Sequence, residues 1–255
     1  MTDTSPDVLL VATQERIRLI TLNRPGSRNA LSAELRMKFF GALRAAEQSE
    51  EVDVVIVTGT DPAFCAGLDL RELGSELPDL SPRWPDMTKP VIGAINGAAI
   101  TGGLELALYC DILLASERAT FADTHARVGL MPGWGMSVRL PQVVGRQFAR
   151  RMSLGSEFLT AERARAVGLV TEVVPHEQLL DAARALALSI TANDQRAVRS
   201  MVGAYRQMDA VTDGPSLRIE ADVADEWLRS QDTSAVIAAN REAIIRNGQA
   251  QSRRR

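Results

Sequence analysis

Short apolar runs rich in β-branched residues alternate along this chain with segments of helical periodicity. The run Val54–Thr58 is typical of a buried strand, whereas Leu35, Phe39 and Leu43 recur at the spacing of one helix face. Parallel strands need such crossover helices between them, so the alternation predicts an α/β fold with mostly parallel pairing. The strands expected are 8–12, 17–22, 54–58, 90–95 and 112–115, and the helices expected here are 33–47 and 103–109.

The last third of the chain has a different pattern, because helical periodicity persists after Ala161. We therefore divide the chain into a core, residues 1–190, and a helical C-terminal region, residues 191–255. Residues 70–89 are rich in proline, glycine and acids and predict a loop with one helical turn. The helices expected after Ala161 are 161–167, 177–190, 194–208, 216–229 and 234–247.

Charge and cysteine content limit the partners and the compartment. Lys and Arg number 29 against 32 Asp and Glu, a net charge of −3, which argues against a nucleic-acid-binding protein. Two cysteines are too few for a disulfide framework and indicate a reducing cytoplasm. No apolar stretch has the length of a signal-peptide core or a membrane span, so we expect no membrane partner.

Several familiar catalytic sites do not fit the sequence. Gly133-Trp134-Gly135 begins like a dinucleotide-binding fingerprint, but Val138 stands where the third glycine belongs. The Walker phosphate loop and the GxSxG nucleophile turn are absent. The only two histidines are His125 and His176, and neither has a histidine partner at ligand spacing, so no metal site is expected.

Two glycine turns follow predicted strands, one around Gly67 and one at Gly102-Gly103. Backbone N–H groups exposed at such turns, with a helix N-terminus behind them, can stabilise a developing oxyanion. Glu105 falls in the first helical turn, where the macrodipole favours the ionised form that a general base needs. Plain turns and a glutamate that only supports the helix start are the alternative interpretation.

A series of short motifs runs in order along the chain: Leu22-Asn23-Arg24-Pro25 with Asn29-Ala30-Leu31, Phe64-Cys65-Ala66-Gly67-Leu68-Asp69-Leu70, Lys89-Pro90-Val91-Ile92 with Ile95-Asn96-Gly97, Gly102-Gly103-Leu104-Glu105-Leu106-Ala107, Cys110-Asp111, Pro132-Gly133, Arg139-Leu140, Val144-Gly145 and Ala166-Val167-Gly168-Leu169-Val170. Taken together, these motifs resemble those of the enoyl-CoA hydratase/isomerase (crotonase) family. The fold that this resemblance implies is a spiral of β-β-α units, followed by a helical C-terminal region that makes trimers, often paired as a dimer of trimers.

The resemblance also implies an activity, that of a lyase of fatty acid metabolism which adds water across the 2,3 double bond of an enoyl-CoA thioester. The backbone N–H groups of Leu68 and Gly102 would form the oxyanion hole, and Glu105 would be the acid/base. Coenzyme A (CoA) is part of the substrate, and no separate cofactor is implied. The further residues expected to bind CoA or substrate are Arg24, Arg28, Ala30, Ala66, Gly67, Asp69, Leu70, Arg71, Gly103 and Trp134.

His125 stands where typical hydratases carry a second glutamate. A histidine can give or take a proton near neutral pH, so His125 could replace that acid, or it could only line the pocket. In an extended segment Asp123 would share its face and orient it. The substitution leaves open decarboxylation, thioester hydrolysis, carbon–carbon cleavage, isomerisation, or acyl-CoA binding without catalysis. The indole of Trp134 could narrow the acyl site or fill the core.

Overall fold

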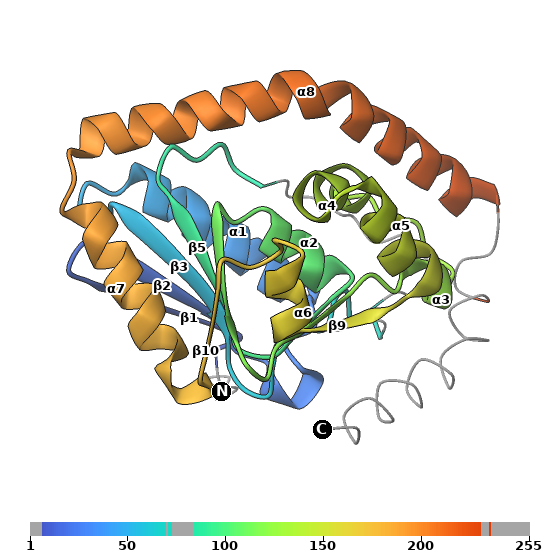
Figure 1. The fold of residues 1–255 in the computed structure, drawn as a ribbon, viewed down its shortest axis with the longest axis horizontal. Coiled ribbons are helices and arrows are strands. Elements are labelled where there is room, and N and C mark those ends of the chain that lie inside the picture. Colours follow the sequence, from blue (N-terminus) through green and yellow to red (C-terminus); the bar gives the residue numbers. More distant parts are fainter. Residues whose placement is uncertain (1–6, 70, 73–83, 231–234, 236–255) are drawn as a thin grey trace, which may run out of the picture.

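The computed structural model describes residues 7–69, 71–72, 84–230 and 235. They form two sheets with helices packed around them (Figure 1). The larger sheet has the order β1 (Leu9–Gln14), β2 (Ile17–Leu22), β3 (Val54–Gly59), β5 (Val91–Ile95), β7 (Ile112–Ser116) and β10 (Glu172–Val174). The smaller sheet has the order β4 (Ala63–Cys65), β6 (Ala98–Ile100), β8 (Thr120–Ala122) and β9 (Phe158–Thr160).

Successive strand pairs build both sheets at once. In the pairs β3/β4, β5/β6 and β7/β8, the first strand joins the larger sheet and the second joins the smaller one. Within each sheet these strands pair in parallel; only β1 with β2 and β8 with β9 are antiparallel. The predicted α/β class with mostly parallel pairing is confirmed, although the short strands of the smaller sheet were not predicted.

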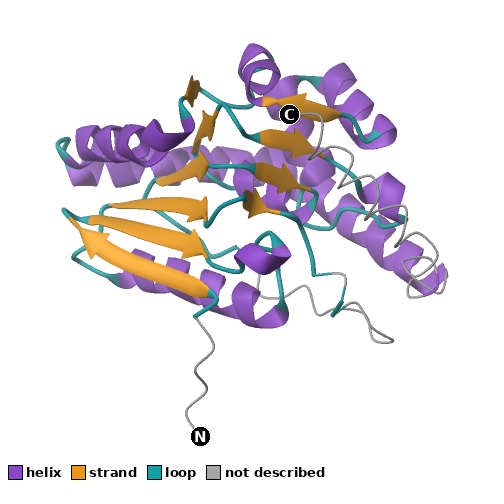
Figure 2. Ribbon diagram, turned by 90° about the horizontal axis from the view of Figure 1, so that it is seen from below, coloured by secondary structure: helices purple, strands orange, loops and turns teal. Residues whose placement is uncertain are grey.

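Helices cover both faces of the larger sheet, as the view in Figure 2 shows. On one face α1 (Ala33–Gln48) and α2 (Gly102–Leu108) pack into the main core. On the other face α7 (Leu179–Thr191) packs against side chains such as Ile56 and Ile92. All six residues of β3 are therefore buried, which explains why its sequence is a continuous apolar run rather than an alternating one. The remaining elements are the 3₁₀ turns η1 (Pro25–Ser27) and η2 (His176–Gln178), and α3 (His125–Val128), α4 (Met136–Val144), α5 (Arg146–Gly155), α6 (Ala161–Ala166) and α8 (Gln195–Ser230).

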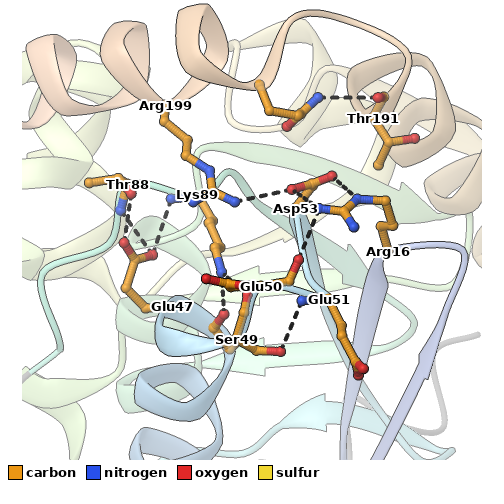
Figure 3. Close-up of polar contacts among 12 residues, drawn as sticks. Arg16, Glu47, Ser49, Glu50, Glu51, Asp53, Thr88, Lys89, Thr191 and Arg199 are labelled. Atoms are coloured by element: carbon orange, nitrogen blue, oxygen red, sulfur yellow. Dashed lines mark hydrogen bonds and ion pairs between the residues drawn. The ribbon is translucent and has the colours of Figure 1, made fainter.

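The long helix α8 is fixed to the core by charged groups near its start (Figure 3). Asp53, which is 1% exposed, accepts hydrogen bonds from Arg199 of α8 and from Arg16. Beside this pair, the buried Lys89 ammonium donates to the carbonyls of Ala46 and Ser49 at 2.7 and 2.6 Å, where α1 ends. A cation at a helix C-terminus satisfies carbonyls that have no partner within the helix.

Helix α8 corrects one prediction, because the expected break between 208 and 216 does not occur. The helix continues through Gly214 and Pro215 and changes direction part-way along (Figure 1). Proline weakens a helix by removing one hydrogen bond and bends it, and contacts such as that between Asp213 and Gln142 of α4 at 2.5 Å stabilise the continuous form.

Some predictions are not tested by the structure. The helix expected over 234–247, Leu70 and most of the loop expected over 70–89 lie outside the described residues. The division of the chain at residue 190 stays a prediction. Across the described ranges, none of the helices combines the length and apolar character needed to cross a bilayer.

Candidate active site

The two glycine turns meet where the small sheet ends, and each contributes a backbone amide. A β-carbon added to Gly102 would lie 3.6 Å from the Leu68 nitrogen, and one added to Gly67 would lie 3.4 Å from the Gly102 nitrogen. The two amide nitrogens are therefore neighbours. In the described part of the chain, neither N–H donates to a backbone carbonyl. Two adjacent N–H groups of this kind can stabilise a developing negative charge on one oxygen.

Gly103 allows this close approach. A β-carbon on Gly103 would lie 2.1 Å from the Cys65 carbonyl oxygen, so only glycine lets α2 start directly against β4. Gly67 has φ +94°, a left-handed conformation that glycine adopts without strain. These two glycines bring the two predicted amide donors together. Gly67 and Gly103, which we had expected to contact substrate, therefore also have a structural role in shaping the backbone.

Glu105 lies in the first turn of α2, as predicted, and is 3% exposed. Its Oε1 accepts a hydrogen bond from the Trp134 backbone N–H at 2.9 Å. Burial raises the pKa of the Glu105 carboxyl to about 7, and this effect exceeds the opposing effects of His125 and of the Trp134 N–H. The helix N-terminus was expected to favour the ionised form of Glu105, but the net shift is upward because desolvation dominates, so both the ionised and the protonated forms occur near neutral pH.

His125 faces Glu105 from the start of α3. Its Nε2 lies 3.8 Å from Glu105 Oε2, while its Nδ1 bonds to Asp123 Oδ1 at 2.7 Å. Burial by itself lowers the pKa of His125, but Asp123 and Glu105 outweigh burial and raise it. The Asp123 pKa is lowered overall, since its bonds to His125 outweigh burial.

Asp123 and His125 do not share a strand face as predicted. Thr124 has φ −111° and ψ 15°, and His125 is the first residue of α3. The Asp123 carboxylate reaches both the His125 ring and the His125 backbone N–H, the latter at 3.1 Å. The contact thus arises from a turn at a helix start rather than from strand alternation, and it orients the imidazole toward Glu105.

A further buried carboxylate, Glu220 of α8, lies next to these groups and was not predicted. It is 6% exposed and accepts hydrogen bonds from the Gly135 and Ser137 backbone N–H groups, each at 2.6 Å. Its charge raises the pKa of both Glu105 and His125. No sequence motif marks Glu220, because its partners lie 85 and 83 residues away.

The segments expected to hold CoA lie side by side and are hydrogen-bonded to each other. Ala66 N–H donates to the Arg28 carbonyl at 3.0 Å, and Arg24 Nη2 donates to Asp69 Oδ2 at 2.9 Å. Burial raises the pKa of Asp69, but bonds from Arg24 and Arg71 lower it overall. Arg24 also donates to the Ala30 carbonyl, so its guanidinium joins the two segments. Arg28 and Arg71 are exposed.

The predicted residues therefore form two neighbouring groups. The first group consists of the two backbone amides and the two proposed acid/base side chains, from Leu68, Gly102, Glu105 and His125. Trp134 belongs to this group through its backbone N–H, which donates to Glu105. Its indole is half-buried against the main core. Arg24, Arg28, Ala30, Ala66, Asp69 and Arg71 form the second group, next to Leu68. Over the described ranges, no three His, Cys, Asp or Glu residues are placed to hold a metal ion.

A scan against protein families matches residues 12–242 to the family described as enoyl-CoA hydratase/isomerase. The chain belongs to this family. The two sheets with their surrounding helices form the crotonase fold of this family. Solved structures of enoyl-CoA hydratases have the same fold.

Among curated relatives, the Arabidopsis thaliana protein named probable enoyl-CoA hydratase 1, peroxisomal, is 43% identical over 83% of this chain and 83% of its own length. The 2,3-dehydroadipyl-CoA hydratase of Escherichia coli is 37% identical over 80% of this chain and 83% of its own. The crystal structure of an enoyl-CoA hydratase from Mycobacterium smegmatis is 64% identical, has a TM-score of 0.84, and aligns over 89% of this chain and all of that one.

Proposed function

We propose that this crotonase-family chain is an enoyl-CoA hydratase, in which Glu105 acts as the acid/base on a substrate held at the Leu68 and Gly102 amides. The observation that carries the proposal is the placement of the buried Glu105 carboxyl, which accepts from the Trp134 N–H at 2.9 Å and faces His125 at 3.8 Å. Burial raises the pKa of this carboxyl to about 7. A carboxyl group with this pKa can both accept and donate a proton near neutral pH. The relatives named as hydratases support the same activity.

The oxyanion chemistry follows from the two neighbouring amides. When water adds to the β-carbon of an α,β-unsaturated thioester, negative charge develops on the thioester oxygen as the enolate forms. The N–H groups of Leu68 and Gly102 would donate to that oxygen. Removing one such donor typically costs about 100- to 1,000-fold in rate.

The proton steps fall to Glu105 and His125. Glu105, held by the Trp134 N–H, would take a proton from the attacking water. His125, held by Asp123 and facing Glu105, would help hold that water or supply the proton to the α-carbon. These steps need a base, an acid and oxyanion donors, so we propose no cofactor beyond the CoA carried by the substrate.

The CoA moiety would bind along the joined segments around Ala66 and Arg28. The backbone near Ala66 and Gly67 would meet the adenine end, and Arg28 and Arg71, which are exposed, would approach the phosphates. Arg24 is bonded to Asp69 and to Ala30, so we assign it mainly to joining these segments. Leu70, Gly103 and Trp134 remain proposed substrate neighbours.

The assembly and compartment are also proposals. The outer face of α8 exposes large apolar side chains, among them Tyr205 at 62%, Val211 at 80% and Ile219 at 65%. Exposed apolar stripes of this kind commonly bind another subunit, which supports a homo-oligomer, a trimer or a dimer of trimers. Cys65 and Cys110 are both free thiols, which fits a reducing compartment such as the cytoplasm.

Hydration of 2-enoyl-CoA thioesters of increasing chain length, followed by loss of the enoyl-thioester absorbance, tests the activity. Wild type should hydrate at least one of them. Glu105→Gln should bind acyl-CoA but turn it over at least about 100-fold more slowly.

His125→Gln should also slow turnover. His176→Gln is the matched control, because His176 bonds to Asp61 and Ser116 at 2.9 and 3.0 Å, at the edge of the large sheet. Normal turnover by Glu105→Gln would refute the assigned chemistry. Activity confined to β-keto or malonyl-type thioesters would replace hydration with another reaction of the family, and binding without any turnover would indicate a non-catalytic role.

A further inference from the structure

The second half of α8 contacts both ends of the segment 129–137, which comprises the connection from α3 to α4 and the first two residues of α4. At one end the Trp227 indole Nε1 donates to the Gly129 carbonyl at 3.1 Å. At the other end, Glu220 accepts from the backbone N–H groups of Gly135 and Ser137. One helix from the C-terminal part of the chain therefore holds this segment at two points.

This segment is hydrogen-bonded to the Glu105 side chain and to the His125 backbone. Trp134, whose N–H holds Glu105 Oε1, directly precedes Gly135, whose N–H donates to Glu220. At the opposite end, Leu130 N–H donates to the His125 carbonyl at 3.0 Å, next to Gly129. A shift of Gly135 would move the Trp134 amide, and with it the carboxylate of Glu105.

Glu220 has no cationic partner within 4.0 Å in the described part of the chain. Both of its oxygens are held by backbone N–H groups at the start of α4, where the helix dipole stabilises a negative charge. The other ionisable groups around Glu105 are His125, Asp123 and Tyr109, with Arg139 of α4 stacked at 4.3 Å over the Tyr109 ring. Glu220 thus places a second buried carboxylate close to this group.

We propose that Glu220 is a positioning residue for Glu105, acting through the backbone of Trp134 and Gly135. Its carboxylate also raises the pKa of Glu105. This inference rests on the proposed function, in which Glu105 is the acid/base. Glu220 does not touch the reacting atoms. Its effect is therefore expected on turnover and on proton affinity rather than on substrate binding.

The test compares Glu220→Gln with wild type. The amide keeps the shape and one acceptor oxygen but loses the charge and the second acceptor. Turnover should fall about 10- to 100-fold, the size typical of losing a group that supports a catalytic residue, with little change in KM. The acid limb of the kcat/KM profile should move to lower pH, because the charge that raises the pKa of Glu105 is gone.

Asp213→Asn is the matched control. Asp213 is 1% exposed and also joins α8 to α4, but it does so through the Gln142 side chain, away from the 129–137 segment. This variant should leave kcat and the acid limb unchanged even if it lowers stability. Equal losses of kcat in both variants with an unmoved acid limb would reduce Glu220 to a packing role and overturn the proposal.

A second variant and a titration separate the role of Glu220 from a loss of folding and from the identity of the reaction. Glu220→Asp keeps the charge on a shorter side chain, so it should lower kcat without moving the acid limb; unchanged kcat would count against positioning. An infrared titration of the Glu105 carboxyl, identified by its loss in Glu105→Gln, should show a lower midpoint in Glu220→Gln. An unchanged midpoint overturns the inference, whereas absent hydration by wild type with a shifted midpoint refutes only the proposed function.

Discussion

Asp53 and Glu105 are both buried carboxylates, 1% and 3% exposed, yet their surroundings are opposite. Asp53 lies between two guanidinium groups, and its hydrogen bond from Arg16, with that from Arg199, lowers its pKa despite burial. Glu105 has one backbone N–H and a histidine 3.8 Å away, and burial raises its pKa to about 7.

The difference shows what the protein does with a buried acid. At Asp53 cations offset the desolvation cost, so the carboxylate stays ionised and joins β3 to α8. At Glu105 that cost is only partly offset, and the neighbouring Glu220 and Asp123 raise the pKa of the Glu105 carboxyl further. The first arrangement suits a structural contact, and the second suits proton transfer near neutral pH.

The largest expected effect is the loss of turnover when Glu105 is replaced. Glu105→Gln should lower kcat by about 100- to 10,000-fold, because the amide still accepts from the Trp134 N–H but cannot take a proton. Asp53→Asn should leave kcat close to that of wild type. Steady-state hydration of the preferred enoyl-CoA measures both, and a comparable loss in Asp53→Asn would remove the distinction between the two sites.

The two acids should also make stability depend on pH in opposite directions. The folded pKa of Glu105 is above its unfolded value of about 4.3, so its contribution to the free energy of unfolding is lost as pH rises toward 7. Relative to wild type, Glu105→Gln should gain about 3 kcal/mol between about pH 4 and pH 8. Urea unfolding at the two pH values measures this gain.

The contribution of Asp53 to stability should change with pH in the opposite direction, and the same unfolding experiment tests it. Its folded pKa is below the unfolded one, so its contribution is present above the unfolded pKa and is lost as pH falls through the folded value. The stability difference between wild type and Asp53→Asn should therefore shrink in acid. A difference that grows on acidification would show that the arginines do not stabilise the ionised form.

Asp53→Asn should next lower the free energy of unfolding by about 2 kcal/mol at neutral pH, since charge-assisted hydrogen bonds to Arg16 and Arg199 are lost. The value is modest because both arginine side chains are partly exposed, at 53% and 36%. Chemical unfolding measures it. In the double variant Asp53→Asn with Arg199→Met, the second change should cost less than it does alone, and full additivity would mean that the pair is not coupled.

The smallest effect is expected at Trp134. The group that contacts Glu105 is its backbone N–H, so Trp134→Phe should change kcat by only about twofold and leave the acid limb in place. A pH profile of kcat/KM for this variant is the measurement. A large shift of the limb would mean that the indole, rather than the main chain, sets the proton affinity of Glu105.

The placements that could be predicted depend on short stretches of sequence. Glu105 follows its glycine turn within a few residues, so its place in the first turn of α2 could be predicted from local pattern. The contact between Asp123 and His125 was also expected, although for the wrong reason, because a turn replaces the predicted extended segment. The predicted break in α8 failed because local helix-breaking residues were outweighed by contacts to α4.

The sequence by itself determined the α/β alternation, the glycine turns and the position of the Glu105 carboxyl, the proposed acid/base, on its helix, since each follows from neighbouring residues and their backbone preferences. Only the tertiary structure decided the protonation of Glu105 and its support by Trp134 and Glu220. The physical reason is that pKa depends on burial and on charges a few ångströms away in space, and here one of those charges, Glu220, comes from a helix far along the chain.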